Sequence, residues 1–298
     1  MMTKKKLQEI EKAAGTPGMS QLGLIWVRFR KNGLAVFGLI GLLILMLVCF
    51  TSPLYIDYER VVHQDLLKAN IAPCIEYPFG TDNLGRDLLA RMLWGGIYSL
   101  ASGFVVIFIS LLLGLFFGSL AGYFGGKTDA VIMRVMDVFM SVPNLLMAMT
   151  LIVVFGQSIV SLWLALSLTS FPGLARVIRS SIMTTRSNEY VDAAKIYGAS
   201  TPKILIKHIL PNCIGPVVVS GTLLLGSTIL GIAGMGFLGI GIASPTPEWG
   251  TILSEVKDYI RYYPYMGIIP GMAIGISVLC INFMGDGLRD ALDPRMKK

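Results

Sequence analysis

The sequence predicts an all-α polytopic membrane protein with six transmembrane helices. Hydrophobic residues make up 54% of the 298 residues and charged residues only 14%, and the mean hydropathy is +0.69. An average soluble domain is about 25% charged. Several uncharged runs are long enough to cross about 30 Å of hydrocarbon as helices. Because a charge at mid-membrane costs about 2.5–3.5 kcal/mol and each Leu or Ile gains about 0.3–0.6 kcal/mol, such runs decide the fold class.

The first span follows a basic arm. Residues 1–32 are polar and rich in Lys and Arg, and residues 33–56 carry no charge. This run is not a secretory signal, because its apolar core is too long, it starts too late and no small-residue cleavage site follows it. We expect an external loop at 57–91, a five-helix core at 92–285 and a charged C-terminal tail at 286–298.

Breaks in charge and composition divide the core. We expect the second span within 92–126, a hairpin of two helices within 138–175, and two further spans within 209–247 and 262–285. The hairpin would turn at Gly156-Gln157-Ser158, and residues 248–261 would form a short polar loop. Glycines crowd residues 231–243 and allow close helix approach. They leave open whether this stretch spans or re-enters the membrane.

The distribution of Lys and Arg predicts the orientation of the spans. Most of the 25 basic residues lie in the N-terminal arm, the 124–134 turn, the 176–212 segment and the C-terminal tail. The others fall on the opposite side: Arg60, Lys68, Arg86, Arg91, Lys257 and Arg261. Because basic loops stay in the cytoplasm, we expect both termini there, which requires an even number of spans.

Other classes of function leave few signs in the sequence. The net charge of +7 is not interleaved with aromatic residues as on nucleic-acid-binding surfaces. The cysteines form no CxxC pair and the histidines no HExxH motif, so we expect no metal site. Residues 122–128, GYFGGKT, enclose three residues between glycines where a phosphate-binding loop has four. We therefore expect no catalytic residue and no nucleotide site on this chain.

One charged segment, residues 189–212 (EYVDAAKIYGASTPKILIKHILPN), interrupts the apolar C-terminal two thirds of the chain. We refer to it as the docking segment. Ser187 is expected to cap a helix that begins near Glu189, because Glu189 and Asp192 suit a helix N-terminus. Gly198 would end this helix. Helical spacing places four small or aromatic residues on one face: Tyr190, Ala193, Ala194 and Tyr197.

A second short helix would follow in the docking segment. It would be capped by Thr201, carry Pro202 in its first turn and stop at Pro211. The two alanines between the tyrosines would form a low protrusion that a cleft of another protein can bind. The carboxylates of Glu189 and Asp192 and the ammonium of Lys195 would orient this contact. The alternative is an ordinary helix on the membrane surface, and the residues alone leave both interpretations open.

Four ordered motifs resemble the permeases of ABC importers. Asp192-Ala193-Ala194, then Gly198, then Ile209-Leu210-Pro211 are similar in spacing to the EAA motif of that family, with Asp192 in place of Glu. The other motifs are FGTDNLGRD at 79–87, AGYFGGK at 121–127 and GDGLRDALDPR at 285–295. Together they resemble the C-type permease of dipeptide, oligopeptide and nickel importers over residues 20–297.

The resemblance implies a type I ABC importer permease in a bacterial cytoplasmic membrane, with a cytoplasmic coupling helix. Two homologous permeases would enclose the pathway, and an extracytoplasmic binding protein would deliver cargo. Two ATPase subunits would hold ATP and Mg and grip the docking segment. The residues implied in this contact are Glu189, Tyr190, Asp192, Ala193, Ala194, Lys195, Tyr197, Gly198 and Pro211.

The resemblance also marks an external loop motif and a C-terminal signature. The loop motif comprises Gly80, Thr81, Asp82, Gly85, Arg86 and Asp87. The signature comprises Gly285, Asp286, Gly287, Arg289, Asp290, Asp293 and Pro294. The charged side chains of the loop motif would either contact cargo or the binding protein, or brace the loop through Asp–Arg pairs, and both interpretations stay open.

Three polar residues within or beside the spans are candidates for the pathway. Asn144 and Gln157 would either line it or bond across helices. Asp137 is the acidic residue closest to a span interior, where carboxylates often have functional roles. We favour pairing of Asp137 with Arg134 or Lys127, since Arg134 lies three residues away on a helix.

An ion-driven secondary transporter is the competing class of function. It would need intramembrane ionisable groups and repeated broken helices, and the sequence shows almost none. Peptides are the expected cargo, and nickel or a metal chelate is the alternative, since similar permeases serve both. The absence of a His or Cys cluster in the expected spans favours peptides.

Overall fold

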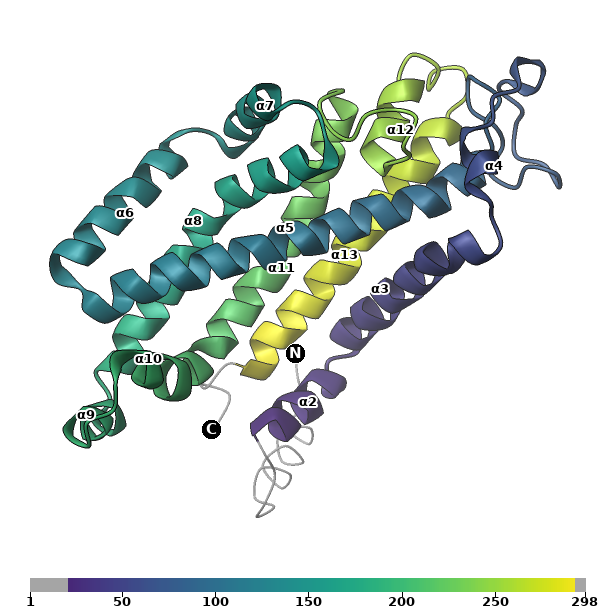
Figure 1. The fold of residues 1–298 in the computed structure, drawn as a ribbon. Coiled ribbons are helices and arrows are strands. Elements are labelled where there is room, and N and C mark those ends of the chain that lie inside the picture. The colour runs from purple at the N-terminus through teal and green to yellow at the C-terminus, as the bar shows by residue number, and fades with distance from the viewer. Residues whose placement is uncertain (1–20, 293–298) are drawn as a thin grey trace.

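The computed structural model describes residues 21–292 as a bundle of long helices (Figure 1). Within this range, five helical stretches are long and apolar enough to cross a membrane. Their helices are α3 (Gly33–Thr51) with η1 (Ser52–Leu54), α5 (Leu88–Phe124), α8 (Ile159–Arg186), α11 (Leu210–Phe237) and α13 (Tyr265–Leu292). The shorter elements are α2 (Gln21–Lys31), α4 (Tyr58–Val62), η2 (Leu66–Lys68), α6 (Gly126–Ser141), α7 (Asn144–Phe155), α9 (Glu189–Ile196), α10 (Thr201–Ile204), the π-helical turn η3 (Leu205–Ile209) and α12 (Trp249–Val256).

The sixth crossing is a bent pair of helices. α6 and α7 pass the length and composition test only together, and their axes meet at 89°. The bend lies at Val142-Pro143, where Val142 has extended backbone angles. Proline lacks an N–H and disfavours a helical conformation of the residue before it. The predicted single helix ahead of the Gly156 turn was therefore wrong, although six crossings remain if the pair counts as one span.

Three glycines let α5 and α8 lie in close contact. Gly114, Gly118 and Gly122 recur every four residues on the face of α5 that meets α8. A Cβ atom on Gly118 would lie 2.7 Å from the carbonyl oxygen of Ala175. Small residues at this spacing let helix backbones approach within a membrane, where packing rather than water exclusion drives association.

The last helix joins the first span to the rest of the bundle. α13 packs against α3 through Gly38, where a Cβ atom would lie 2.4 Å from the carbonyl oxygen of Cys280. On another face it contacts α11, where Gly285 lies against Leu223. The chain therefore forms one bundle in which α13 lies between its N-terminal span and its core.

The segment after α11 differs from its prediction. The glycine-rich helix ends at Phe237, and the chain turns back on it so that Gly241 lies against Gly236. Residues 248–261 are not simply a polar loop, because α12 begins there and Trp249 is fully buried with its indole N–H donating to the carbonyl of Met92 at 2.9 Å. The 231–243 stretch thus splits between the end of a span and a return loop.

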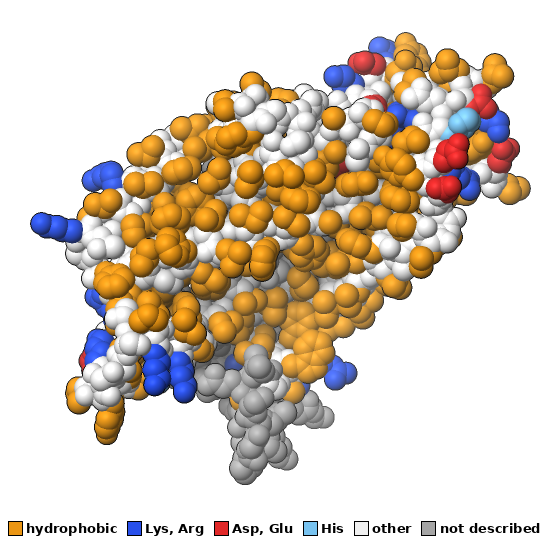
Figure 2. Space-filling model, viewed as in Figure 1, with side chains coloured by type: hydrophobic (Ala, Val, Ile, Leu, Met, Phe, Trp, Pro, Cys, Tyr) orange, Lys and Arg blue, Asp and Glu red, His pale blue; other side chains and the backbone are white. Residues whose placement is uncertain are grey.

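The surface of the bundle is apolar in its middle and charged towards its ends (Figure 2). In the most apolar window of the first span, only 22% of the residues are buried within the chain. Its large exposed side chains include Leu34, Phe37 and Leu47. These side chains fit a helix that faces lipid or another subunit.

The bundle has two distinct ends (Figure 1). α2, α9 and α10 lie at one end, with the last turns of α13, and we refer to it as the docking end. α4 and α12 lie at the opposite end, which we refer to as the loop end. The sequence motifs therefore divide between two poles of the molecule.

Candidate functional site

The docking segment begins with the helix α9, as predicted, although its cap differs. Asn188 occupies the N-cap position without a side-chain capping bond, whereas the Ser187 hydroxyl donates to the carbonyl of Thr184. The predicted serine cap was therefore wrong by one residue. The carboxylate of Asp192 accepts a hydrogen bond from the Lys195 ammonium at 2.8 Å on the exposed side of the helix.

Gly198 ends α9 in the predicted way. Its φ of +75° lies in the left-handed region that favours glycine. The N–H of Gly198 donates to the carbonyl of Lys195 at 2.9 Å, and the N–H of Ala199 donates to that of Ala194 at 3.1 Å. This pair of bonds is the Schellman motif, which satisfies carbonyls left open at a helix end.

The second half of the docking segment is continuous with a span. Ser200, rather than Thr201, is the N-cap of α10, and Pro202 lies in its first turn as expected. The helix does not stop at Pro211, because the π-helical turn η3 carries it directly into α11. Pro211 is the second residue of α11 and follows the π-helical turn almost directly. α10 is therefore joined to α11 without an intervening loop.

Buried side chains anchor the docking segment to two spans. Val191 of α9 is completely buried, together with Ile204 of α10 and Ile209 of η3. They form one apolar cluster with Ile182 of α8 and Cys213 of α11. Burying such side chains contributes about 1.5–3 kcal/mol each. The segment is thus fixed to the bundle, in contrast to a loosely attached surface helix.

The opposite side of the docking segment is exposed and partly apolar. Ile196 and Tyr197 are 84% and 90% exposed, and Tyr190 and Ile206 are also exposed. Ala194 is partly buried and packs against the anchoring cluster. The tyrosine side chains are therefore exposed, whereas the two alanines are partly buried between the anchoring cluster and the surface. Apolar side chains gathered on a charged surface indicate a contact site for another protein.

Arginines fix α8 just ahead of the docking segment. The Arg186 guanidinium donates to the carbonyl of Tyr123 at the end of α5, and Arg179 pairs with Asp129 of α6. Asp137 pairs with Arg176 of α8, and Arg134 lies farther from it at 4.0 Å. Pairing of Asp137 was the favoured prediction, but its main partner comes from another helix.

The external loop motif forms a buried cluster of charges at the loop end. Asp82 is fully buried and accepts from Arg86 Nε at 2.6 Å and from Arg91 Nη1 at 2.8 Å. Both arginines also reach Glu255 of α12, at 2.6 and 2.7 Å. Burial raises the pKa of Glu255, but Arg91 and Arg86 outweigh burial and leave that pKa below its ordinary value.

The rest of this motif shapes the loop. The Thr81 hydroxyl donates to the carbonyl of Lys68 at 2.6 Å, and Asp87 caps α5 by accepting from the N–H of Leu89. Gly80 and Gly85 have positive φ values, and a Cβ atom on Gly85 would lie 1.8 Å from the carbonyl oxygen of Asp65. The structure therefore contains the Asp–Arg pairs that brace the loop, which was one of the two interpretations left open by the sequence.

The C-terminal signature continues a helix and does not begin a tail. α13 runs to Leu292, so Gly285, Asp286, Gly287, Arg289 and Asp290 are all helical. A Cβ atom on Gly287 would lie 2.1 Å from that of Ala35 in α3. The Asn32 amide donates to Asp290 at 3.4 Å, and Arg28 of α2 donates to the carbonyl of Ala291. The signature thus packs against the N-terminal helices, while Asp293 and Pro294 lie outside the described residues.

Two candidate pathway residues lie away from the middle of the bundle. Gln157 donates through Nε2 to the carbonyls of Gly239 and Gly241, at 3.0 and 3.2 Å, and so ties two loops together. Asn144 is exposed at the start of α7, next to the bend. Among residues 21–292 no group of three or more side chains is suited to hold a metal ion.

Glu248 is a structural residue that sequence reasoning missed. Its carboxylate is fully buried and accepts from the Ser99 hydroxyl and from the N–H groups of Gly250 and Thr251, each at 2.9 Å. It therefore caps α12 and joins it to α5. The signal was present, because an acidic residue directly before an apolar run is a helix-start pattern.

Comparison with solved structures defines the fold class. Two structures of the MetNI methionine ABC transporter, described as inward-facing conformations, cover 68% and 69% of this chain and 96% and 98% of theirs, with TM-scores of 0.56 and 0.58. Their identities of 21% and 20% establish a shared fold and nothing finer. The chain has the type I fold of ABC importer permeases.

Sequence comparison then gives the family. A family model described as "Binding-protein-dependent transport system inner membrane component" matches residues 114–298, and one described as "N-terminal TM domain of oligopeptide transport permease C" matches residues 20–73. The chain belongs to this family of inner-membrane transport components.

Three curated relatives cover most of the chain. The oligopeptide transport system permease protein OppC of Bacillus subtilis (strain 168) is 36% identical over 91% of this chain and 89% of its own length. The di/tripeptide transport system permease protein DppC of Pseudomonas aeruginosa (strain UCBPP-PA14) is 37% identical over 93% of both. The glutathione transport system permease protein GsiD of Escherichia coli O6:K15:H31 (strain 536 / UPEC) is 36% identical over 91% of this chain and 90% of its length.

Proposed function

We propose that this permease takes up peptides by coupling its helices to separate ATPase subunits that grip the docking segment. The observation that carries the proposal is the two-sided structure of this segment. Val191 and Ile204 are buried against α8 and α11, whereas Ile196 and Tyr197 are almost fully exposed. An element that is fixed to two spans and offers a projecting apolar surface is suited to transmit force.

The mechanism follows from the connections of the docking segment. ATP and Mg would be bound by two ATPase subunits, one per permease, and their closure would displace α9. Because Gly198 joins α9 to α10 tightly, and α10 continues through η3 into α11, that displacement would reach a span directly. A second homologous permease would complete the pathway. Hydrolysis would thus take place on other chains, and this chain would supply the conduit.

The orientation follows from the two ends of the bundle. The basic residues that predicted a cytoplasmic side, among them Arg28, Arg186 and Lys203, belong to elements of the docking end. We therefore place that end in the cytoplasm and the loop end outside the inner membrane. This orientation puts the docking segment on the side where ATP is available, and the loop motif on the side where cargo arrives.

The orientation is testable by labelling. In a Cys74→Ser background, which leaves the three buried cysteines, a cysteine would replace Leu67 or Tyr197. A membrane-impermeant thiol reagent added to intact cells should label the Leu67 variant, and should label the Tyr197 variant only after lysis. Labelling of the Tyr197 variant in intact cells would reverse the orientation.

Peptides are the cargo that the relatives favour. The three curated relatives described above are named for transport of oligopeptides, di- and tripeptides, and glutathione, itself a small peptide. Nickel or a metal chelate is the alternative cargo. Among the described residues no cluster of metal ligands favours metal handling.

The proposal is tested by reconstitution. The chain, its partner permease and the ATPase subunits would be placed in proteoliposomes with a peptide-loaded binding protein. Uptake of a radiolabelled tripeptide should require ATP and every component. Uptake that persists without ATP and follows an imposed proton or sodium gradient would favour the secondary transporter instead, and uptake of nickel but not of peptide would overturn the cargo.

A further inference from the structure

The junction between α2 and the first span lies at the docking end of the bundle (Figure 1). The span runs for 22 residues from Gly33 to Leu54. At about 1.5 Å per residue, this length matches the hydrocarbon thickness of about 30 Å, so Gly33 lies at the hydrocarbon edge. Arg30 and Lys31 precede Gly33 by three and two residues. Their Cα atoms therefore lie within about 11 Å of that edge, and their side chains reach the headgroup layer, which is about 5–8 Å thick.

α2 packs on the protein with one side and leaves another side exposed. Phe29 is only 3% exposed and forms an apolar cluster with Ala35 of α3 and Ala291 of α13. Trp26 stacks on Phe29, with 5.9 Å between the ring centroids, yet it is 52% exposed. Arg30 is exposed one helical turn after Trp26, on the same face. An indole beside a cation at the end of a span is an arrangement that membrane interfaces favour.

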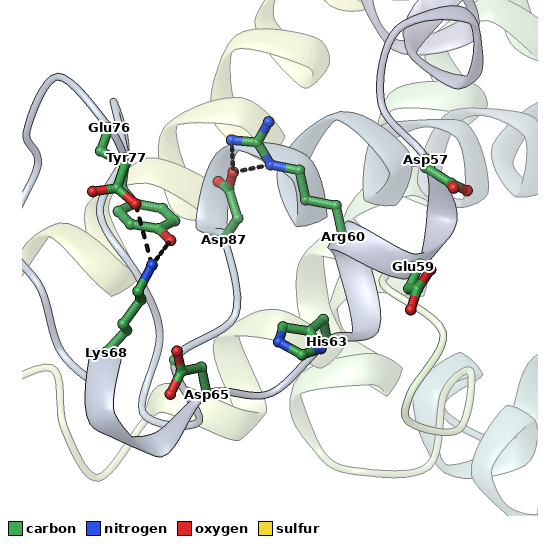
Figure 3. A pocket seen from close by; sticks show the side chains of 10 residues that line it. Asp57, Glu59, Arg60, His63, Asp65, Lys68, Glu76, Tyr77 and Asp87 are labelled. Carbon is green, nitrogen blue, oxygen red and sulfur yellow. Dashed lines mark hydrogen bonds and ion pairs between the residues drawn. The ribbon is translucent and has the colours of Figure 1, made fainter.

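The side chains of Arg30 and Lys31 have no partner within the described part of the chain. A paired cation looks different, as Arg60 shows at the loop end, where its Nη2 atom lies 2.7 Å from Asp87 (Figure 3). Neither Arg30 nor Lys31 has a side-chain hydrogen bond or ion pair within residues 21–292. Two such cations beside a membrane surface attract anionic groups.

Acidic residues at the same end leave this positive charge in excess. The two acids near the end of α13, Asp286 and Asp290, form no ion pair with either cation, and Asp290 accepts a hydrogen bond from the Asn32 amide at 3.4 Å. In the sequence, residues 1–32 carry seven Lys or Arg against two Glu. A cluster of Lys and Arg directly beside a span is typical of sites for anionic lipids.

We propose that Arg30 and Lys31, with Trp26 beside them, bind the headgroup of an anionic phospholipid such as phosphatidylglycerol. The lipid phosphate accepts hydrogen bonds from the guanidinium and the ammonium, and no choline cancels its charge as in phosphatidylcholine. The occupant is lipid because the site adjoins the apolar start of α3, where Leu34 and Phe37 are 60% and 61% exposed. Under the proposed orientation, this lipid belongs to the cytoplasmic leaflet. Because α2 packs against α3 and α13, the bound headgroup holds the N-terminal helix against the C-terminal signature.

The test is amide hydrogen exchange of the complete chain in lipid nanodiscs. The discs hold phosphatidylcholine alone or an equal mixture with phosphatidylglycerol, and exchange is followed in residues 21–31. Phosphatidylglycerol should slow exchange there by about tenfold, because each cation near an anionic surface contributes about fivefold before screening by salt. The double variant Arg30→Gln/Lys31→Gln should abolish this slowing. Lys203→Gln/Lys207→Gln is the matched control, since it removes the same charge from exposed lysines of the docking segment, and it should keep the slowing.

Native mass spectrometry gives a second readout that does not depend on the stability of α2. Chains released from the mixed discs should retain phosphatidylglycerol in preference to phosphatidylcholine, and this preference should fall by at least about fivefold in the double variant. No slowing in the parent chain, or equal slowing in the double variant, would overturn the proposal. So would the same slowing in phosphatidylcholine discs after addition of inorganic phosphate, which would indicate a site for a free anion, or of the ATPase subunits, which would indicate a protein contact. Neither readout requires transport or a fixed orientation, so failure here leaves the proposed function untouched.

Discussion

Arg91 and Glu255 meet at the loop end, 164 residues apart in the chain, with Arg91 Nη1 2.7 Å from the Glu255 carboxylate. Arg91 is completely buried at the start of α5, and its Nε and Nη2 atoms have no partner among the described residues. Glu255 and Asp82 are therefore the two acceptors that this buried charge has. The pair joins the external loop motif to α12.

The first prediction concerns the strength of this pair. Glu255→Gln should lower the free energy of unfolding by about 2–3 kcal/mol, because it removes a charge from two buried arginines. The effect falls below that of a fully buried pair since Glu255 is partly exposed. Thermal unfolding of the purified chain in detergent would show a lower midpoint, and Asp258→Asn, an exposed acid at the same end, should leave it unchanged.

The second prediction is the pH dependence of the same contact. The folded pKa of Glu255 lies below its ordinary value of 4.5. The carboxylate therefore stabilises the fold fully above about pH 4.5, and this stability is lost as the pH falls through the lowered folded pKa. The difference in unfolding midpoint between parent and Glu255→Gln should shrink as the pH drops below 4.5. A difference that stays constant from pH 7 to pH 3 would contradict the ion pair.

The third prediction tests the contact between α5 and α8. Gly118→Ala should destabilise the chain by about 1–3 kcal/mol, because the new methyl group would overlap the Ala175 carbonyl. Gly275→Ala in α13 is the control, since nothing lies within 4 Å of its added Cβ. Alanine there should stabilise the helix by up to about 1 kcal/mol. If the unfolding midpoints of Gly118→Ala and Gly275→Ala moved in the same direction, the close packing of α5 against α8 would be refuted.

The fourth prediction concerns the C-terminal signature. Gly287→Val should separate α3 from the end of α13, because even a Cβ atom at Gly287 collides with Ala35. Amide hydrogen exchange in α2 and the first turn of α3 should become faster, while α8 and the docking segment keep their protection. Unchanged exchange at the N-terminal helices would mean that the signature does not hold them.

Sequence reasoning found the elements whose signals are local. Long uncharged runs located the spans, and Gly198 correctly ended α9. Asp82, Arg86 and Asp87 were selected as a motif, and their pairing was one of two stated interpretations. These features depend on residues close together in the chain, or on the cost of charge in a membrane.

Most of the errors came from contacts that distant residues make. Nothing local shows that Glu248 is buried, because its partner Ser99 lies on α5. The signature at 285–295 looked like a tail because it is charged, although Gly287 packs on α3. The bend before Asn144 was signalled by Pro143 but overlooked, since the run of apolar residues continues through it. An apolar stretch of sequence can pack against other helices of the same protein as well as face lipid.

The central claim is that the docking segment conveys the work of separate ATPase subunits to the spans. The most direct measurement is peptide uptake and ATP hydrolysis, assayed together in the complete complex with Ala193→Arg, and with Thr128→Arg as the control. Thr128 is exposed at the start of α6, outside the docking segment. We predict that Ala193→Arg inserts normally and reduces uptake at least about tenfold relative to ATP hydrolysis, while the control remains coupled. The claim would be contradicted if Ala193→Arg took up as much peptide per ATP hydrolysed as the parent complex. ATP hydrolysis by this chain alone would contradict it too.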